Sequence, residues 1–200
     1  MVRIRTYTRM YGEIGSGEHQ SSIDGVHTHT YKVWNDMIHR CNDTKTQRKQ
    51  PNYKDCTVCD EWLNFQNFAK WYEENYYEIE GHVMCLDKDI LIKGNKIYSP
   101  ETCCIVPHCI NDLFVKSNAI RGEYPIGVGL HKHSGRYRAY IKLGTRKVKH
   151  IGYYDTISEA FNAYKTYKED YIKQTADKFK EHLPTKVYEA LYNYQVEITD

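Results

Sequence analysis

Apolar residues recur at helical spacing in two segments of the first half of the chain. From Thr30 they return every three or four positions, which predicts an amphipathic helix that buries Tyr31, Trp34, Met37, Ile38 and Cys41. A second stripe follows Asp60, which we expect to cap a helix that buries Trp62, Phe65, Phe68, Ala69 and Tyr72. Residues 1–28 are polar and glycine-rich instead, and we interpret them as a flexible N-terminal arm.

The pattern becomes strand-like from His82. A short apolar run over residues 82–92 is followed by a turn centred on Gly94-Asn95 and by a second short run over residues 96–99. A helix is expected after Pro107. Residues 86–114 are therefore predicted to form a strand, a turn, a second strand and a helix.

The C-terminal half predicts a three-stranded antiparallel sheet packed on one helix. Three alternating segments within residues 126–154 are separated by turns at 133–135 and 144–145. Apolar positions then follow a helical period and comprise Ile157, Ala160, Phe161, Ala163, Tyr164 and Tyr167. Together these patterns predict an α+β fold with a first domain over 29–116, a second over 124–174 and a helical tail over 175–200, broken at Pro184.

Composition adds limits to this organisation. The net charge of the 200-residue chain is only +2, but residues 127–150 hold seven Lys and Arg side chains and no Asp or Glu. No apolar run reaches 18 residues and the N-terminus lacks a signal-peptide core, so we expect a cytoplasmic protein without a membrane partner. Seven cysteines without a secretory signal are expected to be reduced thiols, with metal binding as the alternative.

The second predicted strand of the C-terminal sheet carries the strongest functional signal. Its apolar face holds Tyr137, Ala139 and Ile141, and its other face holds Arg136, Arg138, Tyr140 and Lys142. A row of long hydrogen-bonding side chains without an acid suits the major groove of double-stranded DNA. His131, Lys132, Arg146 and His150 extend this surface. The alternative is an ordinary solvated strand face.

The same segment resembles the plant ethylene-response-factor, or APETALA-type, DNA-binding domain. The resemblance is carried by the sequence IGVGLHKHSGRYRAYIKLGTRKVKHIGYYDTISEAFNAY and covers about 50 residues of the unit. It implies that the exposed face of the sheet reads DNA. The chain departs from the family at Gly129, where the family commonly has an arginine, so its base preference cannot be transferred.

The preceding region is similar to phage-encoded His-Asn-His (HNH) homing endonucleases. The similar segments are YKVWNDMIHRC, CTVCDEWLNFQNFAKW and LDKDILIKGNKIYSPETCCIVPHCIN. The resemblance implies a ββα-metal fold and DNA cleavage with Mg²⁺ or Mn²⁺, with Asp87 and Asn111 as metal ligands. Asp89 lies on the same strand face as Asp87 and is a further candidate ligand. Lys88 replaces the motif's general-base histidine, and Thr102 stands where its middle asparagine would hold the loop.

We favour a sequence-recognising, metal-dependent double-stranded DNA endonuclease of HNH type, but these departures leave three interpretations of residues 87–89 open. Lys88 could bind the phosphate while His108 or His82 activates water. Cleavage could be lost and DNA binding kept, which would make the protein a regulator or an architectural factor. The residues from Asp87 to Asp89 could also form only a salt bridge in a hairpin. Besides an endonuclease and a non-catalytic DNA-binding protein, a third class of function is a protein-binding module whose basic face meets an acidic partner.

The cysteines suggest a possible structural zinc site. Cys56 and Cys59 have the CxxC spacing of a zinc half-site, and Cys103 and Cys41 are candidates to complete it. No second CxxC pair occurs in the chain. The alternative is that these thiols are small buried core side chains.

Overall fold

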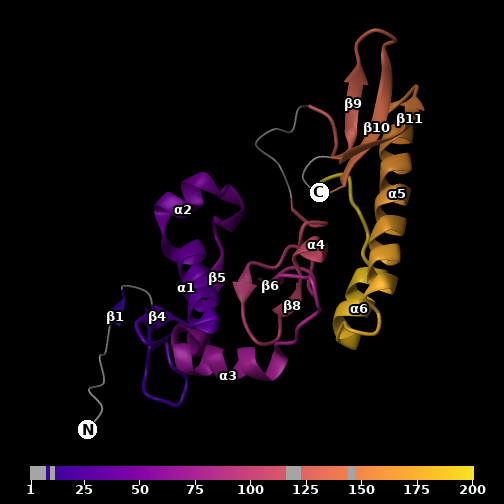
Figure 1. The fold of residues 1–200 in the computed structure, drawn as a ribbon. Coiled ribbons are helices and arrows are strands. Elements are labelled where there is room, and N and C mark those ends of the chain that lie inside the picture. The colour runs from indigo at the N-terminus through magenta and orange to yellow at the C-terminus, as the bar shows by residue number, and fades with distance from the viewer. Residues whose placement is uncertain (1–7, 10–11, 116–122, 144–146) are drawn as a thin grey trace. The chain divides into compact units, whose positions relative to one another are not determined.

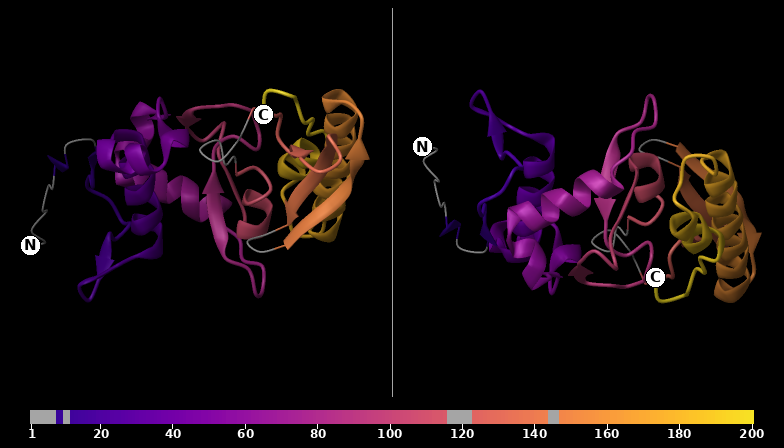
Figure 2. Two further views of the ribbon diagram at one scale, coloured as in Figure 1. Left: turned by 90° about the horizontal axis from the view of Figure 1, so that it is seen from above. Right: turned by 90° about the horizontal axis from the view of Figure 1, so that it is seen from below.

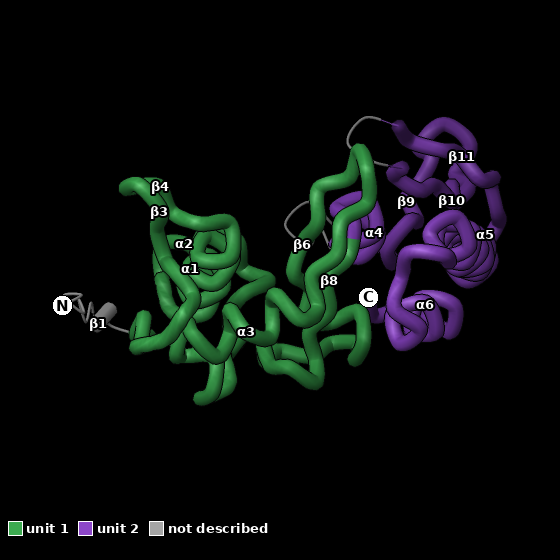
Figure 3. Tube along the Cα trace, turned by 60° about the horizontal axis from the view of Figure 1, so that its bottom comes forward, with its two compact units in different colours: residues 1–106 green, residues 107–200 purple. Residues whose placement is uncertain are grey.

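The structure is a computed structural model that describes residues 8–9, 12–115, 123–143 and 147–200 (Figure 1, Figure 2). The fold is mixed α+β with small sheets, as predicted. The chain divides into two compact units, residues 1–106 and residues 107–200 (Figure 3). The division falls at Pro107 rather than in the expected linker after residue 116. No helix of the described residues is long and apolar enough to cross a membrane.

The first helix of unit 1 has the predicted buried face. α1 (His29–Asn42) is capped by the side chain of Thr28 and buries all five apolar residues of its stripe. Trp34 Nε1 donates a hydrogen bond of 2.7 Å to the carbonyl oxygen of Trp62, so a large buried indole also has its polar atom satisfied. The short helices α2 (Thr44–Lys49) and η1 (Pro51–Tyr53) follow.

The second predicted helix starts later than expected. Residues Asp60–Leu63 form the 3₁₀ turn η2, which buries Trp62, and α3 (Phe65–Asn75) follows. Its N-cap is Asn64, whose side chain accepts a hydrogen bond from Gln66 N at 2.8 Å. Asp60 was therefore the wrong cap. Asn caps a helix as well as Asp does. Asn64 directly precedes the helix whose turns place Phe65, Phe68 and Tyr72 on one buried face.

The described part of the N-terminal segment contacts the rest of unit 1, where we expected a flexible arm. It contains the two-residue strands β1 (Thr8–Arg9), β2 (Gly12–Glu13), β3 (Ser22–Ile23) and β4 (Val26–His27). Gln66 of α3 donates hydrogen bonds to the carbonyl oxygens of Ile14 and His19, and His19 N donates one back to Gln66 Oε1 at 3.0 Å. The side chain of one half-buried glutamine thus holds a glycine-rich stretch that has few apolar residues of its own.

The strands of residues 84–107 pair differently from the prediction. β6 (Met84–Asp87) pairs with β8 (Cys104–Pro107), and β7 (Ile97–Tyr98) pairs in parallel with β5 (Thr57–Val58). The expected hairpin between the runs on either side of Gly94 therefore does not form. Gly94 has a φ of +78°, as a turn residue would, but Asn95 closes the loop with side-chain hydrogen bonds rather than a strand ladder.

Unit 2 is built on a three-stranded antiparallel sheet. β10 (Arg136–Leu143) lies between β9 (Val128–His131) and β11 (Lys147–Tyr154). The helix α5 (Ile157–Lys178) lies beside the sheet in the views of Figures 1 and 2. Its first turn has a capping box, in which Thr156 and Glu159 satisfy each other's backbone amides.

The core of unit 2 forms between the helix and one face of the sheet. Its buried members are Val128, Ala139, Ile141, Ala160, Phe161, Tyr164 and Val196. Gly127 precedes β9 with a φ of +74°, and a Cβ there would lie 2.1 Å from the ring of Tyr164. Glycine is therefore required at this position by both the backbone and the packing.

The predicted tail belongs to unit 2. α5 continues to Lys178, and α6 (Thr185–Tyr192) begins directly after Pro184, as expected. Val196 then returns to the sheet core, so the last residues help to bury the apolar face of β10. The short helix α4 (His108–Asn111) opens this unit.

Candidate nucleic-acid interface

The central strand β10 presents the predicted alternation of side chains. Arg136, Arg138 and Lys142 are exposed and Tyr140 is half-buried, whereas Ala139 and Ile141 are buried in the core. Tyr137, on the same side as Ala139, packs against that core. The side chains of Arg136, Arg138, Tyr140 and Lys142 therefore form one row on the face opposite the core, which we call the open face.

A β-bulge enlarges the open face. Ala139 pairs with Gly152 and Tyr140 pairs with His150, so Ile151 is an extra residue on β11. Two residues three positions apart normally point to opposite faces of a strand. Here the bulge places both Tyr153, opposite Arg138, and His150, opposite Tyr140, on the open face.

Aromatic rings connect the outer strands across this face. The ring of Tyr153 lies 4.5 Å from that of His150 and 4.9 Å from that of His131, measured between centroids. His131 Nδ1 is hydrogen-bonded to Ser134 Oγ at 2.8 Å, which holds the imidazole at the end of β9. His131 and His150 were predicted site residues, and the structure brings them together through Tyr153. Tyr153 was missed because no sequence signal reveals the bulge.

One charge on the open face is partly neutralised. Arg136 Nε donates a hydrogen bond of 2.7 Å to Asp155, which follows β11 and is itself exposed. The row on β10 lacks an acid, but Asp155 is an acidic neighbour that was not predicted from the sequence. Lys132, predicted to extend the surface, is exposed in the turn after β9. Arg146, also predicted, lies outside the described residues.

The predicted catalytic strand ends in a turn held by Asp87. Its Oδ1 atom accepts hydrogen bonds from the backbone amides of Asp89, at 2.8 Å, and Ile90, at 2.7 Å. Asp87 is 8% exposed. Burial, together with the nearby Asp89 carboxylate, raises the pKa of Asp87 to about 6. These contacts make Asp87 the residue that holds the turn.

Lys88 is paired with an acid rather than free to accept a proton. Its Nζ atom lies 3.1 Å from Asp89 Oδ2 and 5.9 Å from the centre of the Tyr98 ring. Burial is the largest influence and acts to lower the pKa of Lys88, but the Asp89 carboxylate, Cys56 and Asp87 together outweigh it, and the net change is upward. Lys88 is therefore protonated at neutral pH and is unsuited to the general-base role of the missing histidine.

Asn95 holds the loop that follows Lys88. Its side-chain amide donates hydrogen bonds to the carbonyl oxygens of Lys88, at 2.6 Å, and Ile97, at 2.7 Å. Thr102 Oγ1 also donates to the Ile97 carbonyl, at 2.7 Å. In the sequence, Thr102 stands at the position where the motif's asparagine would hold the loop, and Asn95 was predicted only as a turn residue. The signal for this role in the sequence is that Asn95, directly after the turn residue Gly94, has an amide group with two hydrogen-bond donors.

The two remaining predicted catalytic residues lie on α4, in unit 2. His108 Nδ1 is 3.1 Å from Asp112 Oδ2, in an exposed pair. Asn111 is the last residue of α4. Their combination with Asp87 and Asp89 of unit 1 into one metal site stays a prediction.

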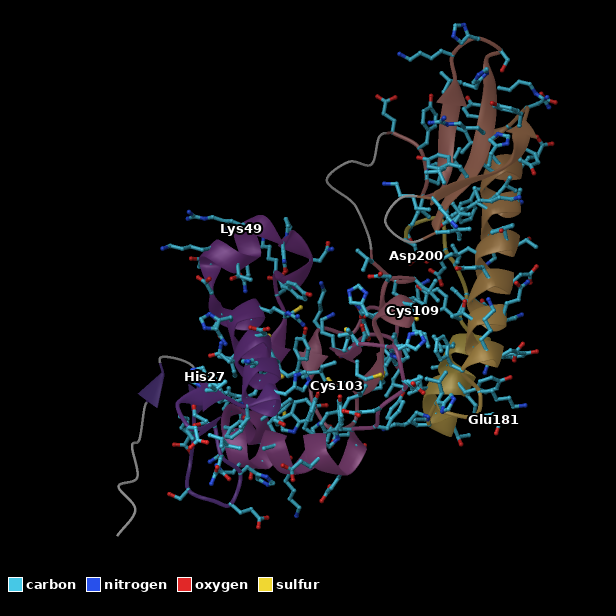
Figure 4. All side chains as sticks on the ribbon, viewed as in Figure 1. His27, Lys49, Cys103, Cys109, Glu181 and Asp200 are labelled. Carbon is cyan, nitrogen blue, oxygen red and sulfur yellow. The ribbon has the colours of Figure 1, made fainter. Side chains whose placement is uncertain are left out.

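All seven cysteines are free thiols. Burial raises the pKa of both Cys41 and Cys103 to about 12, and it also raises the pKa of Cys56 and Cys59. Figure 4 labels Cys103, which is fully buried just before β8. Among the described residues, no three His, Cys, Asp or Glu side chains are grouped closely enough to hold a metal ion. A structural zinc on these thiols therefore stays a prediction, with buried core side chains as the alternative.

Comparison of the chain with protein families, curated proteins and solved structures found no match.

Proposed function

We propose that the protein binds double-stranded DNA through the open face of the β9–β10–β11 sheet. The observation that carries the proposal is the exposed row on β10, backed by the core under Ala139 and Ile141. A packed core makes such a row rigid, and its Arg and Lys side chains match the phosphates and guanine edges of a duplex. The resemblance to the APETALA-type domain supports DNA as the ligand.

Salt-dependent binding to a labelled duplex tests this proposal. We expect the affinity of the full-length protein to fall steeply between 50 and 200 mM salt, because bound phosphates release counterions. Arg138→Ala should weaken binding to a preferred duplex about tenfold or more. Lys178→Ala is the matched control, since it removes an exposed cation from the last turn of α5 and should change affinity less than about twofold.

DNA cleavage is a second hypothesis that we propose only on the HNH resemblance and the strand order of residues 84–111. The pairing of β6 with β8 just before α4 agrees with a ββα arrangement. The hydrogen bonds of Asp87 and the ion pair of Lys88 favour a structural role instead. We therefore rank a non-catalytic DNA-binding protein above an endonuclease.

A plasmid assay separates the alternatives. Nicking or linearisation in Mg²⁺ or Mn²⁺ that disappears in Asp87→Ala would establish the enzyme. Salt-sensitive binding without cleavage supports the non-catalytic protein. Absence of duplex binding at low salt would refute the main proposal and leave the binding of an acidic protein partner.

A further inference from the structure

Gly129 occupies a position on the open face where the backbone does not require glycine. It lies on β9 directly opposite Arg138 of β10. Its φ is outside the left-handed region, unlike those of Gly127 and Gly135 on either side of β9. A strand interior usually carries a side chain, because glycine there weakens the strand. The missing side chain must therefore be explained by what occupies its space.

Arg138 occupies that space. A Cβ built on Gly129 would lie 3.2 Å from Arg138 Nε and 3.5 Å from Tyr140 Cε1. The guanidinium carbon of Arg138 lies 4.9 Å from the centre of the Tyr140 ring, within the range of a cation–π contact. Arg138 thus lies across the bare backbone of β9 and against the neighbouring tyrosine of its own strand.

Arg138 also differs from Arg136 in its charge environment. Arg136 is paired with Asp155, whereas no ion pair with an acid is formed by Arg138 within the described part of the sheet. On its other side, Arg138 is opposite Tyr153, whose ring contacts His131 and His150. The guanidinium of Arg138 is therefore held by an aromatic ring and has its hydrogen-bond donors available to a ligand.

We infer that Gly129 is a positioning residue that fixes Arg138 for the recognition of a guanine in the bound duplex. This inference rests on the proposed DNA binding. A guanidinium already held in one orientation loses less side-chain freedom on binding, and its planar fork matches the O6 and N7 atoms of guanine. A side chain at residue 129 would press on Arg138 Nε, so the guanidinium would have to shift by a few tenths of an ångström and would keep its charge near the DNA with a less well fixed direction.

Base preference at single positions tests the inference. The preferred site of the full-length protein is selected from a randomised duplex library, and dissociation constants are measured for that duplex and for variants with each guanine replaced. We expect that replacing one particular guanine weakens binding by the wild type about 10- to 100-fold. The same replacement should leave the affinity of Arg138→Ala unchanged. Gly129→Ala should reduce the discrimination at that base to about threefold or less, with non-specific affinity changed less than about twofold.

Two further variants separate positioning from loss of structure. Leu130→Ala changes the next residue of β9, whose side chain is on the other face, and should keep the discrimination. At that guanine, the double variant Gly129→Ala/Arg138→Ala should show no less base discrimination than Arg138→Ala alone, because Gly129 acts only through Arg138. Thermal unfolding of each variant, with midpoints close to wild type, shows that the sheet is intact.

The outcomes distinguish this inference from the proposed function. Wild-type protein that binds no duplex would overturn both. Guanine discrimination that depends on Arg138 but survives in Gly129→Ala would overturn the inference alone. The inference alone would also be overturned if Gly129→Ala lowered discrimination further in a protein that already carries Arg138→Ala. It would likewise be overturned if discrimination at no guanine were lost in Arg138→Ala.

Discussion

Asp87→Asn should stabilise the protein at neutral pH if Asp87 holds a turn. The carboxylate accepts two backbone hydrogen bonds through Oδ1, and the amide oxygen of asparagine can accept the same two. The substitution removes a buried negative charge that lies close to Asp89. Because burial raises the pKa of Asp87 from 3.8 to about 6, the ionised side chain destabilises the fold by at most about 3 kcal/mol. Asparagine should recover part of this energy at pH 7.

The pH dependence gives the sharper measurement. The folded state binds the Asp87 proton more tightly than the unfolded state, so this residue's contribution is fully present below pH 3.8 and is lost as the pH rises through about 6. Urea unfolding at a series of pH values should therefore show this loss of stability in the wild type and a flatter profile in Asp87→Asn. Asp87→Ala is the control, because it removes the charge and both hydrogen bonds and should be less stable than Asp87→Asn at every pH.

A metal-binding role for Asp87 predicts a different pattern. If Asp87 ligated a divalent cation, Mg²⁺ or Mn²⁺ would raise the stability of the wild type and have no effect on Asp87→Asn. A large stabilisation by either cation, or a loss of stability at pH 7 in Asp87→Asn equal to that in Asp87→Ala, would refute the structural role. The second hypothesis, DNA cleavage, would gain from that result.

Two other predictions concern unit 2. Gly127→Ala should destabilise it by about 3 kcal/mol or more, because a Cβ would meet the Tyr164 ring and the φ is +74°. Gly135→Ala, with a φ of +69° and no atom within 4 Å, should cost only about 1–2 kcal/mol in the same thermal unfolding experiment, and equal losses would contradict the packing argument. Burial lowers the pKa of Lys168 to about 8, so at this residue the unfolded state binds more protons between pH 8 and 10.5, and Lys168 by itself contributes a rise in stability with pH there. Lys168→Met should abolish that rise in chemical denaturation, and an unchanged slope would assign it to another group.

The elements that the sequence predicts well are those whose side chains repeat. The stripe from Tyr31 to Cys41 is buried along α1, and the alternation from Arg136 to Lys142 agrees with the exposure along β10. In both segments one face packs against a core, and the spacing of hydrophobic residues along the sequence identifies that face. The pairing of β7 with β5 has no such signal. It joins two-residue strands about forty positions apart, and long-range pairing depends on tertiary contacts that local patterns do not encode.

The candidate site was predicted only as far as regular alternation extends. Counting by twos places Arg138 and Tyr140 correctly, but it places Tyr153 and His150 on opposite faces of β11. The extra residue Ile151 reverses that assignment for one of them. The same limit applies to Asp155, which reaches Arg136 only because β11 ends beside the start of β10.

These two unpredicted contacts change how the open face should be weighed as a DNA surface. The ion pair with Asp155 lowers the contribution that Arg136 can make to phosphate binding, since a duplex must compete for its guanidinium. The bulge places the ring of Tyr153 opposite Arg138, in contact with the rings of His131 and His150. The N–H groups of the Arg138 guanidinium remain available to a ligand there. Specific recognition should therefore be concentrated at the middle of β10, around Arg138 and Tyr140, and Arg136 should contribute mainly at low salt, where the duplex competes best with Asp155.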